Sequence, residues 1–212
     1  MGLDIHVMRP RRLFMRDYEP PVQKLMPGVE VEVICAKPLS ATDAGMVEHA
    51  ILEYVRRHQR NKRYFMPNSD EIHFSERFSY TNFDLLREFA AFLDYPQKTL
   101  LIGPEKAFGD GYDLDALPSL KGAWRTKKSS YPHLVFHEDN QGFYFPTTFD
   151  FPVKTDFGYF GSTMSLREEL VKLSTITHRA LRHKETIDGA IQLLLKAAEA
   201  SEQSGLPIVF DG

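Results

Sequence analysis

The sequence predicts an α+β fold in which a mostly antiparallel sheet is covered by about four helices. Segments with the two-residue alternation of strands and segments with the three-to-four-residue spacing of helices occur in mixed order, without a repeating unit. Several strand-like segments follow one another across short turns, which favours local hairpins. The chain has 212 residues, with 42% hydrophobic and 26% charged side chains. It therefore suits a single domain over residues 1–212.

Composition argues against several classes of protein. The single Cys35 has no second cysteine for an internal disulfide. No run approaches the roughly 18 apolar residues of a membrane span, and the first residues lack the apolar core of a signal peptide. We therefore expect a cytoplasmic protein that does not associate with membranes. The net charge of -3 argues against bulk nucleic-acid binding, which usually appears as a strongly basic domain.

The first half of the chain predicts two strands and two helices. Alternating apolar residues indicate strands at 2–8 and 29–35. Between them, residues 9–28 carry four prolines and predict a long connection without a helix. Helical spacing then predicts helices over about 42–60 and from 81 to about 93, with an extended stretch between them at 71–80.

The second half predicts a hairpin and two more helices. Residues 103–130 show no sustained period and predict irregular structure. The segments 133–137 and 142–145 are separated by turn-forming residues and predict a hairpin, with another strand near 149–153. Ser165 and Glu168 match a capping box that would start a helix reaching residue 181. A last helix over about 186–204, ended by Gly205, precedes a strand at 206–210.

Three polar residues form a candidate metal site. His133, His137 and Asp139 would project from one face of a predicted strand, and such a set suits zinc or iron. A small hydrolase that uses a divalent metal is one interpretation. Asp4 and His6 imitate the first ligands of metallophosphoesterases, but later segments of that motif are missing. The alternative is a solvent-facing strand beside a turn, and because no nucleophile motif occurs, we favour a protein that is not an enzyme.

Gly161 and Ser162 stand where a helix is expected to begin. A helix N-terminus that follows a glycine can bind a phosphate or carboxylate, so an anionic nucleotide sensor is another interpretation. The alternative is that the Ser162 hydroxyl binds only local backbone amides.

Arginines and aromatic residues indicate a protein interface. Arg9, Arg11 and Arg12 lie outside any predicted helix end, so the backbone dipole does not account for them, and they could bind an acidic protein. Sixteen Phe and nine Tyr exceed the number expected for a core, and Tyr144 and Tyr159 lie beside predicted turns. The alternative is a second hydrophobic cluster beneath long loops.

Scattered motifs extend over most of the chain. They are the opening Met1-Gly2-Leu3-Asp4, Ser79-Tyr80-x-x-Phe83-x-x-x-Arg87, His137-x-Asp139-x-x-Gly142-x-Tyr144-x-Pro146, and Gly161-Ser162 followed by Leu166-x-x-Glu169-Leu170. In these pieces the chain resembles a loose group of uncharacterised bacterial and phage proteins. The resemblance implies a cellular context without a known activity, and it adds Tyr80 and Arg87 to the candidate binding residues. Similar members often have Ser-Asp-x-Asp after the histidine, and Glu138-Asp139-Asn140 departs from that pattern.

Together these features favour a non-enzymatic inhibitor or immunity-type protein of bacterial or phage conflict, without a cofactor. It would bind another protein, which could be acidic. The metal-dependent hydrolase and the nucleotide sensor are the alternatives.

Overall fold

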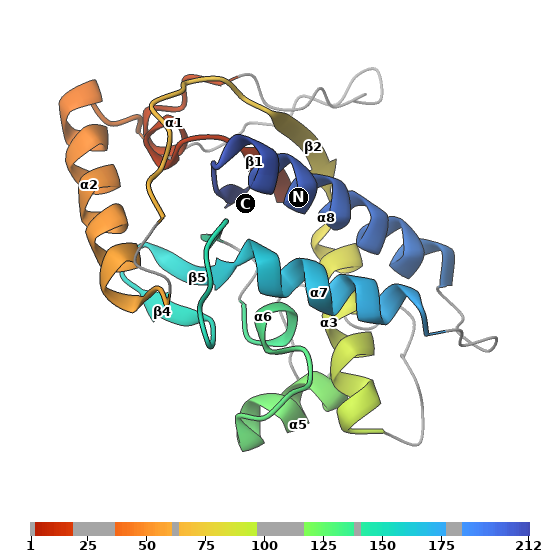
Figure 1. The fold of residues 1–212 in the computed structure, drawn as a ribbon. Coiled ribbons are helices and arrows are strands. Elements are labelled where there is room, and N and C mark those ends of the chain that lie inside the picture. The colour runs from red at the N-terminus through yellow and green to blue at the C-terminus, as the bar shows by residue number, and fades with distance from the viewer. Residues whose placement is uncertain (1–2, 19–36, 61–63, 97–116, 138–140, 177–183) are drawn as a thin grey trace.

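A computed structural model describes residues 3–18, 37–60, 64–96, 117–137, 141–176 and 184–212 (Figure 1). Within these ranges the chain forms seven helices and one six-stranded sheet, which confirms the predicted α+β class. The strands are β1 (Leu3–Val7), β2 (Phe74–Phe78), β3 (Gln141–Phe145), β4 (Val153–Thr155), β5 (Gly158–Ser162) and β6 (Ile208–Asp211).

The sheet has the strand order β2-β1-β6-β3-β5-β4. Adjacent strands in the sheet are antiparallel except β3 and β5, which run parallel. The two ends of the chain meet in its centre, because Val7 of β1 is paired with Ile208 of β6. The strands β2 and β4 form its opposite edges.

Helices cover both faces of the sheet (Figure 1). One core packs α1 and α2 against side chains such as Phe143, Phe145 and Val209, and the other packs the remaining helices against Tyr144, Ile208 and Phe210. None of the described helices combines the length and hydrophobicity needed to cross a bilayer. The helices are α1 (Pro10–Met15), α2 (Ala41–His58), α3 (Tyr80–Asp94), α5 (Pro118–Thr126), α6 (Pro132–Val135), α7 (Thr163–Ser174) and α8 (Lys184–Ser204).

The three shortest helices were not predicted. α1 lies in the segment expected to be free of helix, α5 lies in the segment expected to be irregular, and α6 replaces the strand predicted at 133–137. The predicted hairpin is therefore wrong, and β3 pairs with β5 and β6 instead. The predicted strand at 29–35 lies outside the described residues.

These three helices share one way of starting. Each has a proline in its first turn and no capping side chain of its own. Proline tolerates the first helical position because the amide it lacks would have no partner there. The following amides still need acceptors, and these come from residues distant in the sequence.

A buried glutamate of a longer helix caps each short helix. Glu48 of α2 accepts a hydrogen bond from the Arg11 amide, 3.2 Å away. Glu88 of α3 accepts from the amides of Ser119 and Leu120 at 3.0 and 2.7 Å. Glu169 of α7 accepts from the amides of His133 and Leu134 at 2.9 Å each. These contacts fasten α1 to α2, α5 to α3 and α6 to α7.

The start of α7 also differs from the prediction. Its N-cap is Ser162, whose hydroxyl accepts from the Ser165 amide at 3.1 Å, so the helix begins before the predicted capping box of Ser165 and Glu168. Glu168 is exposed, whereas its neighbour Glu169 is buried and caps α6.

Two glycines make room for a stacked pair of rings at the centre of the sheet. The rings of His137 and Tyr144 stack with centroids 4.1 Å apart. A Cβ at Gly142 would lie 2.3 Å from Cε1 of His137 and 2.9 Å from the Tyr159 carbonyl oxygen. A Cβ at Gly161 would lie 2.6 Å from the Tyr144 ring. Strands β3 and β5 therefore need glycine at these positions.

The substitution Gly142→Ala is expected to lower the free energy of unfolding by about 2 kcal/mol or more, because the Tyr159 backbone cannot move away from the new methyl group. Chemical denaturation would measure the change. Gly189→Ala is the matched control, since nothing lies within 4 Å of its Cβ position and alanine in a helix is favoured by roughly 1 kcal/mol. Equal stability of the two variants would contradict the close packing at β3.

Stability is expected to peak at about pH 6 to 7. Burial lowers the pKa of His6 and His133 from 6.5 to about 4. Stability therefore falls as the pH drops below 6.5, because both imidazoles bind a proton in the unfolded chain but stay neutral in the folded one. Burial raises the pKa of Glu169 from 4.5 to about 8, so stability also falls as the pH rises towards 8. Each proton bound by only one of the two states changes the free energy of unfolding by about 1.4 kcal/mol per pH unit. Below about pH 6.5 the loss of stability from the two histidines is therefore larger than the gain from Glu169.

Urea denaturation across this pH range would test the expected maximum. Burial also raises the pKa of Glu88 and of Asp4, so each of these groups likewise lowers stability as the pH rises from its unfolded pKa towards its folded pKa. Glu169→Gln should flatten the decline between about pH 6.5 and 8, while Glu168→Gln, at the exposed neighbouring position, should leave it unchanged. An unaltered decline in Glu169→Gln would show that this carboxyl group does not retain its proton in the fold.

Candidate interaction surfaces

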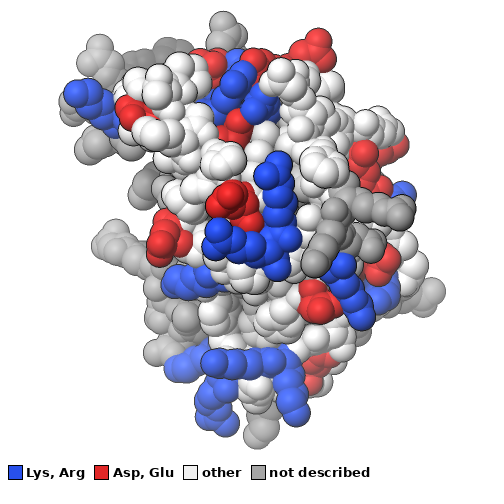
Figure 2. All heavy atoms as spheres, turned by 60° about the vertical axis from the view of Figure 1, so that its left-hand side comes forward, with Lys and Arg blue, Asp and Glu red and all other residues white. Residues whose placement is uncertain are grey.

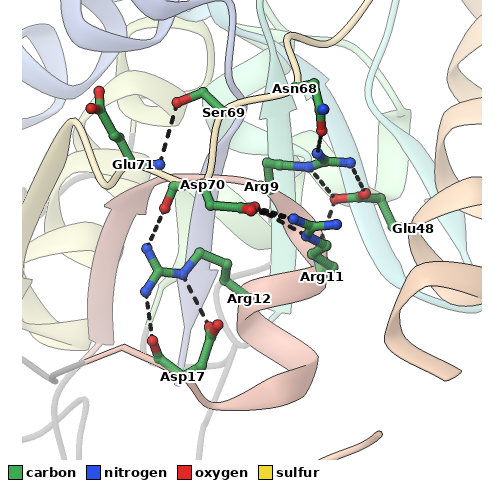
Figure 3. Close-up of polar contacts among 9 residues, drawn as sticks. All are labelled: Arg9, Arg11, Arg12, Asp17, Glu48, Asn68, Ser69, Asp70 and Glu71. Carbon is green, nitrogen blue, oxygen red and sulfur yellow. Dashed lines mark hydrogen bonds and ion pairs between the residues drawn. The ribbon is translucent and has the colours of Figure 1, made fainter. Parts of the chain in front are cut away.

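The N-terminal arginines lie at the junction of α1, α2 and the segment before β2 (Figure 3). The Arg9 guanidinium binds Glu48 and also donates to Asn68. Arg11 forms an ion pair with Asp70. Arg12 binds Asp17 at 3.0 Å and donates to the Asp70 carbonyl oxygen at 2.5 Å.

This network gives the arginine cluster a structural role that the sequence analysis missed. Two of the three carboxylates come from other elements, 39 and 59 residues further along the chain. Each guanidinium is therefore compensated within the molecule, and an acidic partner would have to displace these contacts. Binding of a partner by Arg9, Arg11 and Arg12 stays a prediction.

Most other predicted binding residues are buried. Arg87 is fully buried, pairs with Asp84 at 3.0 Å and donates to the Val135 carbonyl oxygen. Tyr144 is fully buried and donates from its hydroxyl to the His133 carbonyl oxygen at 2.8 Å. Tyr159 is 8% exposed and Tyr80 is half-buried. These side chains help to build the core and offer little area to a partner.

The predicted anion site at Gly161 and Ser162 is also buried. The Ser162 amide donates to Nδ1 of His133 at 3.1 Å, and its hydroxyl caps α7. The Thr163 hydroxyl donates to the Tyr144 carbonyl oxygen at 2.9 Å. These groups already satisfy one another, so the local interpretation accounts for all three residues.

The predicted metal ligands do not come together among the described residues. His133 accepts at Nδ1 from Ser162, and its Nε2 lies 3.2 Å from the Phe149 carbonyl oxygen, so the neutral ring binds backbone on both sides. His137 stacks on Tyr144 in the core, close to Gly142 and Gly161, and Asp139 lies outside the described residues. No group of three metal-binding side chains is found in the part of the chain that the structure describes. The expectation of no cofactor and the alternative of a divalent metal both stay predictions.

Asp4 and His6 take part in a polar cluster beside α1. The Tyr18 hydroxyl and the Arg16 guanidinium both donate to the Asp211 carboxylate, which is paired in register with Asp4. The Tyr18 ring packs edge-on against His6, whose Nδ1 lies 3.0 Å from the Ser75 hydroxyl. Burial raises the pKa of Asp4 and lowers that of His6 to about 4. A neutral, buried imidazole next to a partly desolvated carboxyl group fits a structural cluster.

Five exposed carboxylates lie on the segment before β2, on β2 itself and in the last turns of α8, and we call this set of residues the acidic edge. The segment leading to β2 crosses the end of α8, because the Tyr64 hydroxyl donates to the Gly205 carbonyl oxygen at 3.0 Å. Figure 1 shows β2 running alongside α8, and the two elements are in contact. The acidic edge comprises Asp70, Glu71, Glu76, Glu199 and Glu202.

The sequence analysis did not find the acidic edge. Its carboxylates come from two segments more than a hundred residues apart, and neither segment contains a long acidic run. Glu76 and Glu199 form no ion pair with a described residue, whereas Asp70 and Glu202 are paired with Arg11 and Arg167. Glu71 lies 3.7 Å from His73. Two of the five carboxylates, Glu76 and Glu199, therefore carry negative charge that no ion pair with a described residue compensates.

Comparison with known proteins assigns the chain to a family. No curated protein and no solved structure matches it. A profile of the family described as "Putative DNA-mimic protein" matches residues 1–210, almost the whole sequence. The chain therefore belongs to this DNA-mimic family.

Proposed function

We propose that this protein binds a DNA-binding protein through its acidic edge and keeps that protein from DNA. The observation that carries the proposal is the match of the whole chain to a family described by DNA mimicry. The acidic edge supports it, because exposed carboxylates can occupy the sites at which a partner's Lys and Arg side chains bind phosphates.

The spacing of the carboxylates suits a short patch of phosphates. Glu199 and Glu202 are three residues apart on α8, which gives a rise of about 4.5 Å along the helix axis. Successive phosphates of one DNA strand are about 3.4 Å apart along the duplex axis. Five carboxylates on the edge would thus replace a few phosphates, and the interface would depend on shape and hydrogen bonds as well as charge.

The ion pairs at the edge would not prevent such binding. In the pair between Arg11 and Asp70, the side chains are 30% and 58% exposed. Exposed pairs of this kind contribute about 0 to 1 kcal/mol. A partner's arginine could replace Arg11 at Asp70, or Arg167 at Glu202, at a small cost in free energy. This requires that the new ion pair is desolvated when the partner binds.

The proposal includes a role in bacterial or phage conflict. A protein that occupies the DNA site of a nuclease or regulator inhibits it without chemistry, which fits the non-enzymatic interpretation of the sequence. The resemblance to bacterial and phage proteins supports this context.

Displacement of host proteins from immobilised duplex DNA would test the function. At about 0.1 M salt, where the Debye length is about 10 Å, the protein should release a specific subset of proteins from duplex DNA-cellulose. The variant Glu71→Gln/Glu76→Gln/Glu199→Gln should lose at least about tenfold in potency, because each lost charge-assisted contact is worth roughly 1.5 kcal/mol or more.

The control removes three exposed carboxylates elsewhere on α7 and α8, as Glu168→Gln/Glu185→Gln/Asp188→Asn. This variant has the same net charge as the first and should keep its potency. Failure of the unmodified protein to release any DNA-bound protein would refute the proposed function. Equal loss in both variants would place the interface away from the acidic edge.

A further inference from the structure

Positive charge collects around the β4 edge of the sheet, which lies opposite to the β2 edge. Residues 118–137 contain four Lys or Arg and no Asp or Glu. Figure 2 shows this side, with blue side chains over its middle and along its lower edge. We call it the basic face, and its exposed cations are Arg56, Arg57, Arg60, Lys121, Arg125, Lys127, Lys128 and Lys154.

The elements of the basic face are joined by direct contacts. The Arg60 amide donates to the Thr148 carbonyl oxygen at 2.8 Å, which fixes the end of α2 to the loop before β4. In that loop, Phe151 stacks on Phe136 with ring centroids 5.0 Å apart. Phe136 in turn packs edge-on against Trp124 of α5 at 5.7 Å. The end of α2, the loop before β4 and α5, which carry or adjoin these cations, are therefore linked through packed side chains.

Among the described residues, the positive charge on this face is only partly paired with carboxylates. Arg125, Lys127 and Lys128 form no ion pair with any described residue. Arg57 and Arg60 form pairs with Glu53 and Asp150 in which both partners are about half to three-quarters exposed. Such pairs exchange readily with a ligand's anionic groups.

Two exposed aromatic rings lie among these cations. Phe65 is 74% exposed and has the Arg56 guanidinium 6.0 Å from its ring centroid. Phe151 is 42% exposed and its ring is held by the stack on Phe136. Exposed rings offer apolar area whose burial under a ligand is favourable. Rings of this kind beside arginines can stack with unpaired bases.

We propose that the basic face binds single-stranded nucleic acid, with phosphates on its lysines and arginines and bases stacked on Phe65 and Phe151. Duplex DNA would use the cations but would leave the rings uncovered, since its bases are already stacked. An acidic polypeptide would likewise offer no base to the rings. The proposal concerns a second surface and goes beyond the proposed inhibition of a DNA-binding protein.

The strength of binding should depend steeply on salt. If about five phosphates are neutralised, the logarithm of the association constant should fall with a slope of about -3.5 against the logarithm of salt concentration. Affinity should then drop about 100-fold between 50 and 200 mM salt. The negative net charge of the rest of the chain does not prevent this, because screening limits its reach to about 10 Å.

Fluorescence anisotropy with a labelled oligo-dT of about 20 nucleotides, longer than one typical stacking site, tests the proposal. The variant Arg125→Gln/Lys127→Gln/Lys128→Gln should bind at least tenfold more weakly. Phe65→Leu/Phe151→Leu should lose about fivefold or more while keeping the salt slope, because stacking is removed and the charges remain. Matching thermal melting curves would show that these exposed positions leave the fold intact.

The control Lys172→Gln/Lys184→Gln/Lys196→Gln removes the same charge from exposed positions on α7 and α8, and it should bind like the unmodified protein. Three results would overturn the proposal: no binding of oligo-dT at about 50 mM salt, equal affinity for a duplex of the same length, or equal competition by polyglutamate at matched charge. Oligonucleotide binding by the Glu71→Gln/Glu76→Gln/Glu199→Gln variant should be retained, so failure of the proposed inhibitory function would remain distinguishable.

Discussion

Three glutamates hold the helical layers of this molecule together. Each lies on a long helix and caps the start of a short one. Glu48, Glu88 and Glu169 accept hydrogen bonds from the first amides of α1, α5 and α6. The glutamates are buried, so removing one would leave buried amides unpaired, at about 1 to 3 kcal/mol each. The cost of desolvating carboxyl groups is visible in Glu169, whose pKa burial raises to about 8.

The same three contacts explain which parts of the fold the sequence could predict. Long helices such as α2 and α8 have an apolar stripe that repeats over four or more turns, and this pattern needs no distant partner. The short helices have too few residues for a periodic signal, and their caps lie 31 to 37 residues away in the sequence. In α6 and just after it, the alternation of His133, Val135 and His137 even imitates a strand.

The candidate sites follow a similar division. Because helices cover both faces of the sheet, the consecutive residues Tyr144 and Phe145 are both buried, one in each core, so rings that seemed suited to an interface form core contacts instead. The arginines of α1 could be recognised as a cluster, but their carboxylate partners could not, since Asp70 and Glu48 join them only in the folded chain. The acidic edge has the same origin, because folding brings β2 beside α8.

The small net charge conceals a separation of charge that matters for recognition. β2, at the acidic edge, and β4, on the basic face, lie at opposite edges of a six-stranded sheet, about 24 Å apart at the usual strand spacing. That distance exceeds the Debye length of about 8 Å at physiological salt, so each surface acts on its surroundings almost independently. A partner with a basic groove is attracted by one edge and repelled by the other, which restricts the orientations in which it can dock. The net charge of the whole chain therefore describes neither surface. The expectation that this net charge excludes nucleic-acid binding applies to the average field of the molecule and not to the basic face.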